Sequence, residues 1–506
     1  MLFMKKIKKV PICLLLCCVI LLGIPLSSAA REYEAGEWGY YGATQELVYR
    51  GTQALILCSG LFASNRTLDQ IYELEYVNPM TYPTEPIAKE RIEIDYERKA
   101  VAIGVGDPND PIPAMRAAYR DGFGCLVMAI DQTFDDIDSL PIIDMPPLSG
   151  DPETIPWPDG ELVEEKPLPP KVDQAALEAA GEYAFDRVNH GGHEGQVTTG
   201  LLVVYKGDII YERYMDGFDR NTKTRTWSTA KSINSTILGI AIDQGLLDLD
   251  MKMPWEWPPY YGEFPDPRSE IKLVDVIHMA SGLDPVDDEN QPEYGSHLCY
   301  FGGMDIEFKS TNRGLVAKPG TVHNYENYDT LLSVLALRKV LNDDKKYWEF
   351  TRRNLFDKIG IRSTLVGADH KGNLIFSSQV YTNSRDLARI GLLYLNDGKW
   401  NGEQIVSHEW IEWALSPSPQ NDEYGGQIWL MPDKGLEGVP MDAFSTSGAQ
   451  GNFCIVVPSY DLVVVRRGLD WRVKYKGLDR WDMLREVLKA FPALDYTPVK
   501  RPPVDH

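Results

Sequence analysis

Strand-like segments lie near both ends of one long stretch of this chain, and this placement limits the folds that the chain can adopt. A tight turn at Lys206–Gly207–Asp208 joins the first two segments into a hairpin. The segments are 199–207, 208–215, 425–430, 452–459 and 461–468. Residues 246–415 between them have mostly helical patterns. We expect an α+β fold, in which both ends of the domain build one antiparallel sheet flanked by helices, with an all-helical insertion.

The remaining residues divide by composition into an N-terminal extension, a linker and a tail. Residues 31–140 mix helical and strand-like patterns and form either an extension or a small domain. Residues 141–171 contain nine prolines, which predicts a linker or a strap over the surface. The main domain is then expected at 172–496, and 497–506 is a tail.

Residues 1–30 have the pattern of a secretory signal peptide. Four Lys within the first nine residues precede a short apolar run, and the small residues Ser28 and Ala30 mark a cleavage point. The apolar run is short for a spanning helix, so we expect no stable membrane span after cleavage; an uncleaved N-terminal anchor is the alternative. The pattern predicts an exported protein, either periplasmic or secreted.

Charge and cysteine content exclude several classes of partner and site. The net charge of −23 repels phosphate backbones, so we expect no nucleic-acid partner. Outside the signal, the four cysteines are widely spaced and form no C-x-x-C pair, which argues against a zinc ribbon or a thioredoxin-type site. In an exported protein, a Cys58–Cys125 disulfide and buried free thiols are both compatible with this pattern.

The helix predicted at 226–245 begins with Ser228 and Lys231, which lie one turn apart on the same side. A serine hydroxyl is a poor nucleophile until a base takes its proton, and a partly desolvated lysine can be that base. The S-x-x-K pattern alone is weak, because it also occurs at Ser269–Lys272, where helix capping explains it better. The alternative for Ser228 is likewise a helix-terminal serine beside a solvated lysine.

Two further motifs follow in a fixed order. Tyr325-Glu326-Asn327 follows a Pro-Gly turn and precedes a helix, whereas the Y-x-N copies at Tyr76, Tyr381 and Tyr394 lack this context. Thr446-Ser447-Gly448 precedes a strand. With these three motifs, residues 171–492 resemble the serine β-lactamase and penicillin-binding protein family. The resemblance is greatest to its class C branch, the family VIII carboxylesterases and the 6-aminohexanoate-oligomer hydrolases.

The resemblance implies a role for each motif residue. Ser228 attacks a carbonyl, and Lys231 with Tyr325 accepts the proton and returns it to the leaving group. Because unperturbed Lys and Tyr both titrate near ~10, their surroundings must lower one of the two pKa values. The resemblance gives substrate binding to Asn327, Thr446, Ser447 and Gly448. It places the oxyanion against the backbone N–H groups of Ser228 and Ala449.

One departure from the family pattern bears on the substrate. The family usually has Lys or His where this chain has Thr446, and that cation helps to hold a carboxylate. We therefore expect an exported serine hydrolase acting on a small-molecule amide or ester without an obligatory anion. The alternatives are a non-catalytic cell-wall or ligand-binding protein and a true β-lactamase or DD-peptidase. No cofactor and no metal is expected, because His190 and His193 lie in a glycine-containing loop without further ligands.

Overall fold

The structure is a computed structural model that describes residues 40–76, 89–257, 265–285, 296–470 and 477–504. Contacts divide the chain into Met1–Ala43 and Thr44–His506. Of the first unit, the structure describes only residues 40–43, which are the first turn of helix α2. The signal peptide expected at 1–30 lies outside the described residues. The second unit is described below.

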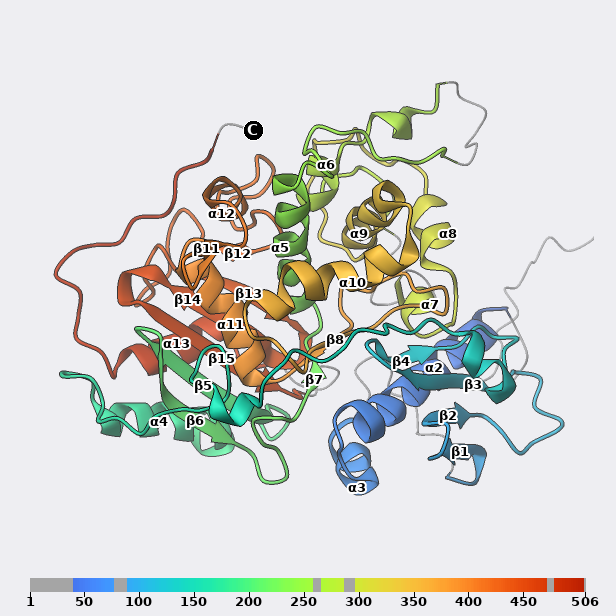
Figure 1. Cartoon of the computed structure of the whole chain (residues 1–506), viewed down its shortest axis with the longest axis horizontal. Helices are drawn as coiled ribbons and strands as arrows, with labels where there is room; N and C mark the ends of the chain where they lie inside the picture. Colours follow the sequence, from blue (N-terminus) through green and yellow to red (C-terminus); the bar gives the residue numbers. More distant parts are fainter. Residues whose placement is uncertain (1–39, 77–88, 258–264, 286–295, 471–476, 505–506) are drawn as a thin grey trace, which may run out of the picture. The chain divides into compact units, whose positions relative to one another are not determined.

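A six-stranded antiparallel sheet confirms the fold class expected from the sequence. The strands, in their order across the sheet, are β12 (Trp429–Leu430), β13 (Phe444–Gly448), β14 (Asn452–Val457), β15 (Leu462–Gly468), β5 (Thr198–Tyr205) and β6 (Asp208–Tyr214). The register pairs Leu462 with Tyr205 and Val464 with Val203. Strand β15, the last of this sheet along the chain, therefore lies beside β5, the first of this sheet along the chain. Figure 1 shows this meeting of the green β5 with the orange-red β15.

Alternating side chains of these strands enter two separate cores, because successive residues of a strand point to opposite faces. On one face Val203, Ile455 and Val464 pack with helices α4 (Gln174–Phe185) and α13 (Arg480–Leu488). On the other face the sheet packs against α5 (Thr229–Asp243) and α11 (Ser384–Leu395). This second face positions the N-terminus of α5, where Ser228 lies.

The stretch between the two halves of the sheet is mainly helical, and it also contains short strands. The helices and helical turns are η7 (Pro267–Glu270), α6 (Leu273–Ile277), α7 (Ser296–Tyr300), α8 (Ile306–Thr311), α9 (Tyr328–Leu341), α10 (Asp344–Asn354), η8 (Phe356–Lys358), α11 and α12 (His408–Ala414). The short strands are β7 (Thr224–Arg225), β8 (Leu365–Val366), β9 (Val380–Thr382), β10 (Lys399–Trp400) and β11 (Glu403–Gln404). Strand β9 lies between β7 and β8, so it joins the start of α5 to the helical region.

Residues 40–76 and 89–127 form helices and a second, four-stranded antiparallel sheet. The helical segments are α2 (Tyr40–Cys58), η1 (Ser59–Ala63), α3 (Leu68–Ile71), η2 (Tyr72–Tyr76) and η3 (Lys89–Arg91). The strands are β1 (Ile92–Asp95), β2 (Ala100–Ile103), β3 (Met115–Arg120) and β4 (Gly124–Val127), paired in that order. The helical pattern in this part of the sequence does not form one continuous helix, because the Thr67 side chain caps a new helix by accepting the Gln70 N–H.

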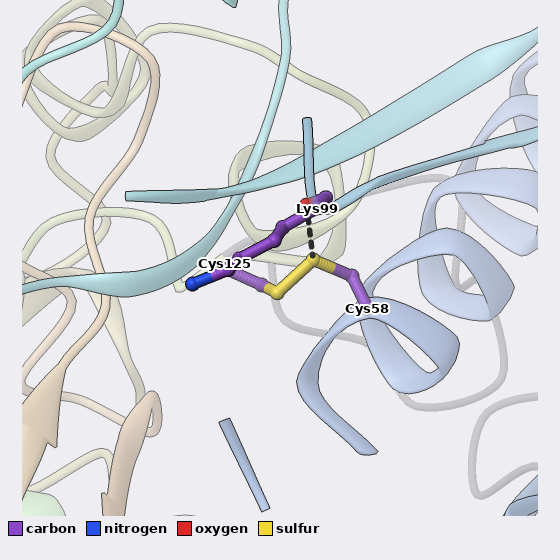
Figure 2. The surroundings of a disulfide bond; sticks show 3 residues. All are labelled: Cys58, Lys99 and Cys125. Carbon is purple, nitrogen blue, oxygen red and sulfur yellow. Dashed lines mark hydrogen bonds between the residues drawn. A yellow bond between two sulfur atoms is a disulfide. The ribbon is translucent and has the colours of Figure 1, made fainter. Parts of the chain in front are cut away.

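A disulfide joins the helical segment to the second sheet. Cys58 at the end of α2 and Cys125 in β4 are bonded, with their Cα atoms 6.0 Å apart. Figure 2 shows the bond and the backbone oxygen of Lys99, which lies 3.9 Å from the Cys58 sulfur. Cys299 and Cys454 are buried free thiols. The structure therefore selects the disulfide from the two alternatives that the sequence left open for Cys58 and Cys125.

The proline-rich segment 141–171 has only one short helical turn, η5 (Pro152–Thr154), within an extended path. Arginines of the helical region hold its backbone oxygens. Arg352 donates to Pro146 O at 2.8 Å, Arg362 donates to Leu148 O at 2.7 Å and Arg389 donates to Pro158 O at 2.7 Å. The segment therefore lies along the helical region and is anchored at several points.

Ser269 of the second S-x-x-K copy does not cap a helix, contrary to the expectation from the sequence: the N-cap residues here are Asp266 and Lys272. Asp266 caps the short helix η7 by accepting the Arg268 N–H, and the Ser269 hydroxyl donates to Asp266 O at 2.6 Å. Asp266, not Ser269, is the cap because it stands at the N-cap position, where its carboxylate can accept the backbone N–H two residues later.

None of the described helices is both long and apolar enough to span a membrane.

Candidate active site

The backbone just before α5 adopts a conformation that side chains rarely take. Trp227 has φ +53°, in the left-handed region that few residues other than glycine adopt. Its indole Nε1 donates to Gln450 Oε1 at 2.7 Å, and the Arg225 guanidinium stacks 3.6 Å from the ring centroid. These contacts hold the turn that presents Ser228 at the start of the helix. Ser228 itself makes no side-chain capping hydrogen bond, so its hydroxyl is not used as a helix cap.

Lys231 lies one turn into α5 and is buried, with 1% of its surface exposed. Its Nζ donates to Asn327 Oδ1 at 2.5 Å and to Ser377 O at 3.0 Å. The same nitrogen lies 5.3 Å from the ring centroid of Tyr325. The alternative of a solvated lysine is therefore excluded, and the S-x-x-K and Y-x-N motifs meet at this ammonium.

The loop that carries Tyr325 is anchored by a buried ion pair. Glu326 pairs with Arg313 at 2.8 Å and also accepts the backbone N–H of Tyr328 at 3.1 Å. Both charged side chains are almost fully buried, and in such a setting the loss of either partner is costly. This pair fixes the middle residue of the Tyr325–Asn327 motif, and Glu326 also holds Tyr328, the residue that follows the motif.

Aromatic rings surround the Tyr325 side chain. Its ring lies 5.3 Å from that of Trp429 and 5.8 Å from that of Tyr424, the latter in an edge-to-face arrangement. Burial, followed by the nearby Tyr325 hydroxyl, raises the pKa of Tyr424 well above its usual value. His323 of the same loop contacts His278 O through Nδ1 at 3.0 Å, and burial lowers its pKa.

Strand β13 ends in close contact with the start of α5. A Cβ atom on Gly448 would lie 2.0 Å from Thr226 O and 3.2 Å from Ser228 N. Only glycine permits this approach, because any side chain would collide with the Thr226 carbonyl. The end of the strand, including the backbone of Ala449 that follows, is therefore next to the backbone N–H of Ser228.

A cavity of about 340 Å³ opens at this point, and five of the predicted residues line it. These are Ser228, Tyr325, Ser447, Gly448 and Ala449. Lys231 and Asn327 do not line it but bond to each other beside it. The Thr446 hydroxyl donates to Thr229 Oγ1 at 3.4 Å and accepts Cys454 N–H at 3.2 Å, so it is turned toward α5 and β14.

Several lining residues were not identified from the sequence. Trp429 and Phe453 come from β12 and β14; Arg480 is the first residue of α13, and Leu478 and Asp479 immediately precede it. Burial lowers the pKa of Arg480. In the sequence Arg480 has the pattern of an ordinary first-turn cation, so no local signal distinguished it. Within the described parts of the chain, no cluster of three His, Cys, Asp or Glu side chains is arranged to hold a metal ion.

A scan against protein families matches residues 185–466 to the Beta-lactamase family, which is more than half of the chain. The chain belongs to this family. Members of the Beta-lactamase family are serine hydrolases, and the matched residues contain all three motifs described above.

The relatives compared below have low sequence identity to this chain, at most 26%. The 6-aminohexanoate-dimer hydrolase of Paenarthrobacter ureafaciens is 26% identical over 252 residues, which are 48% of this chain and 61% of that protein. The chain therefore spans about three fifths of the length of this curated relative. Two solved structures are similar over 64% of the chain. A family VIII carboxylesterase is 15% identical with a TM-score of 0.47, and 98% of it is covered. A penicillin-binding protein homologue from Caulobacter crescentus is 13% identical with a TM-score of 0.48, and 97% of it is covered.

Proposed function

We propose that this chain is an exported serine hydrolase that cleaves an amide or ester bond through an acyl-enzyme on Ser228. The observation that supports it most is the environment of Lys231. This buried lysine is held by Asn327 and Ser377 one turn from a serine that caps nothing, and it stands where a proton acceptor for that serine is needed.

The proposed reaction has two steps. Ser228 Oγ forms a bond to the substrate carbonyl carbon while Lys231 and Tyr325 take the hydroxyl proton. The carbonyl oxygen becomes an oxyanion and binds the backbone N–H groups of Ser228 and Ala449. The C–N or C–O bond then breaks, and the leaving amine or alcohol receives the proton. Water hydrolyses the resulting ester by the same route, which restores the serine and releases a carboxylic acid.

Asn327 has a different part in this proposal from the one the family resemblance implied. Its Oδ1 accepts a hydrogen bond from Lys231, so in this proposal it positions the ammonium. Thr446 likewise supports the contact between β13 and α5 through Thr229. Direct substrate contacts then belong to Ser447 and Gly448, together with the aromatic wall at Trp429 and Phe453.

Two observations support the class of bond that we propose is cleaved and the cellular compartment that we propose for the protein. The named activity of the Paenarthrobacter ureafaciens relative is hydrolysis of an amide dimer, which keeps amides among the candidate substrates. The Cys58–Cys125 disulfide supports export, since disulfides persist mainly in oxidising compartments.

Labelling of the nucleophile tests the proposal. A fluorescent alkyl phosphonate is expected to label the wild-type protein and to leave Ser228→Ala unlabelled, with Ser269→Ala as the matched control that keeps labelling. Hydrolysis of nitrocefin, short p-nitrophenyl esters, D-amino-acid amides and linear amide oligomers is measured in parallel. Equal labelling of wild type and Ser228→Ala would refute the acyl-enzyme. Ligand binding without turnover of any substrate would favour a non-catalytic binding protein that retains the fold.

A further inference from the structure

A second, smaller cavity lies next to the turn that presents Ser228. Its volume is about 30 Å³, and its walls include residues from the stretch 52–75, which precedes the family match, together with Arg225, Trp227 and Gln450. Gln450 also lines the cavity beside Ser228, so the two cavities share this residue. A cavity of this size holds about two water molecules or one monatomic ion.

Arg225 brings a positive charge to this cavity, and no carboxylate among the described residues forms an ion pair with it. Its Nε donates to Ser378 O at 3.1 Å and its Nη2 to Ser378 Oγ at 2.7 Å, and both acceptors are uncharged. The guanidinium carbon lies 3.6 Å from the ring centroid of Trp227 and 5.2 Å from that of Phe301. Aromatic rings fix the position of a guanidinium without neutralising its charge.

The other charges around the cavity do not cancel this cation. Among the described residues that line it, Glu75 is the one carboxylate, and it already pairs with Arg66, whose Nε and Nη1 are buried without a hydrogen-bond partner. Arg467 donates to the backbone oxygens of Thr224 and Arg225, and it too has no carboxylate partner within the described ranges. Burial lowers the pKa of Arg225, and it lowers the pKa of Arg467 to about 9. A buried positive charge therefore remains, and such a charge is costly unless an anion pairs with it.

We infer that this cavity is a binding site for one small inorganic anion, of the size of chloride, which pairs with Arg225 beside the Arg66 guanidinium. The cavity is too small for phosphate, sulfate or an organic acid, so a monatomic halide is the class of anion that fits. The hydroxyls of Ser59 and Tyr381 also line it and supply further hydrogen-bond donors. The anion lies outside the cavity that contains Ser228, so it is a structural ligand and the site does not depend on the proposed reaction.

The position of this site links anion binding to the nucleophile. Arg225 stacks on Trp227, whose Nε1 donates to Gln450 Oε1 at 2.7 Å, and Trp227 directly precedes Ser228. Trp227 has φ +53° and Gln450 has φ +58°, and this left-handed conformation is strained for residues other than glycine. An anion that holds Arg225 in place therefore stabilises the strained turn. This consequence, unlike the site itself, rests on the proposed function.

Diffraction and unfolding of the full-length protein test the site without reference to catalysis. Wild-type crystals grown in sodium bromide are expected to show an anomalous difference peak in the cavity, next to the Arg225 guanidinium. In solution, sodium chloride replaces sodium gluconate at constant ionic strength, because gluconate is too large for the cavity. As chloride increases, the Tm of wild type is expected to rise by about 2–4 °C more than that of Arg225→Gln and then to level off.

Variants of a second stacked arginine separate the site from general effects of salt. Arg213→Gln is the matched control, because Arg213 also lies over an aromatic ring, 4.6 Å from the Phe185 centroid, but pairs with Glu182 at 2.7 Å outside the cavity. It is expected to keep the wild-type response to chloride, and Arg225→Lys is expected to restore part of it. Chloride is also expected to speed phosphonate labelling of Ser228 at least about fivefold in wild type and not in Arg225→Gln.

Each outcome decides either the site or its link to the nucleophile. Bromide crystals with only water in the cavity refute the site, and so does an equal chloride response of wild type and Arg225→Gln. If Arg225→Gln does not fold, the wild-type crystals alone decide. A bromide peak with an unchanged labelling rate leaves the site standing and refutes its link to Ser228. If wild type takes no label in any salt, the proposed function fails, and the diffraction and unfolding results still decide the anion site.

Discussion

At the scale of single residues, the site depends on a place where two backbones almost touch. Gly448 ends β13 where a Cβ atom would lie 2.0 Å from Thr226 O. The segment that it touches contains Trp227 in a left-handed conformation, held by Gln450 and Arg225. Small shifts here would move the Ser228 N–H relative to the strand, so under the proposed mechanism this contact positions the N–H groups that bind the oxyanion.

We predict that Gly448→Ala removes most of the activity while the protein still folds. The added methyl forces the strand away from Thr226, which costs about 1–3 kcal/mol in stability for a crowded site. Loss of alignment between Ser228 N–H and the strand is expected to lower kcat/KM at least about tenfold. Hydrolysis rates and thermal unfolding are measured on the same samples. Wild-type kcat/KM in this variant would show that the contact does not position the oxyanion groups.

At the scale of elements, helix α11 has two roles. One side packs on the central sheet, where a Cβ on Gly391 would lie 2.7 Å from Cys454 Sγ and from Val463 Cγ1. The other side holds the proline-rich segment through Arg389, which is fully buried. Arg389 donates to Pro158 O and Gly160 O, each at 2.7 Å, and pairs with Asp386 and Glu161. The Arg389 guanidinium therefore provides hydrogen-bond and ion-pair partners both to the proline-rich segment and to α11.

We predict that Arg389→Met destabilises the protein by about 3–5 kcal/mol, because it leaves buried carboxylates and carbonyls without their partner. Arg213→Met is the control: its side chain is more than a third exposed and pairs with Glu182, whose side chain is more than half exposed, so no buried carboxylate loses its partner. That variant is expected to change stability by less than about 0.5 kcal/mol. Urea unfolding, analysed with one m-value for both variants, measures the two free energies of unfolding. Similar midpoints for the two variants would show that the segment contributes little to stability.

At the scale of the whole second unit, the part of the chain before the main domain shares a core with it. Tyr49 and Cys58 of α2 belong to the same buried cluster as Phe301 and Tyr328, and the Trp227 ring packs against that cluster. The Cys58–Cys125 bond closes a loop of 67 residues within this core. The segment that precedes the family match therefore shares a core with Trp227, the residue next to Ser228.

We predict that removing the disulfide lowers stability by about 4 kcal/mol, the loop-entropy value for a loop of this length. The double variant Cys58→Ser/Cys125→Ser is compared with wild type by thermal unfolding, each with and without a reductant. Reductant is expected to lower the Tm of wild type and to leave the double variant unaffected. An equal response of the two proteins would mean that the bond contributes nothing in solution.

The sequence by itself determined those features that depend on neighbours along the chain. Short runs of apolar and β-branched residues located strands near both ends of the domain, and i, i+3 geometry put Ser228 and Lys231 on one side of one helix. The order of the three motifs was sufficient to place the chain in its family. The domain boundaries and the catalytic roles of the site residues stay predictions.

Only the tertiary structure decided which side chains share the cavity. The spacing of Thr446 and Asn327 along the chain could not show that one turns toward α5 and the other bonds to Lys231. Arg480 lies more than 250 residues from Ser228 in the sequence, and its place in the cavity wall follows from the packing of α13 on the sheet. Local patterns carry no information on such long-range contacts, because many packings are compatible with the same amphipathic helix.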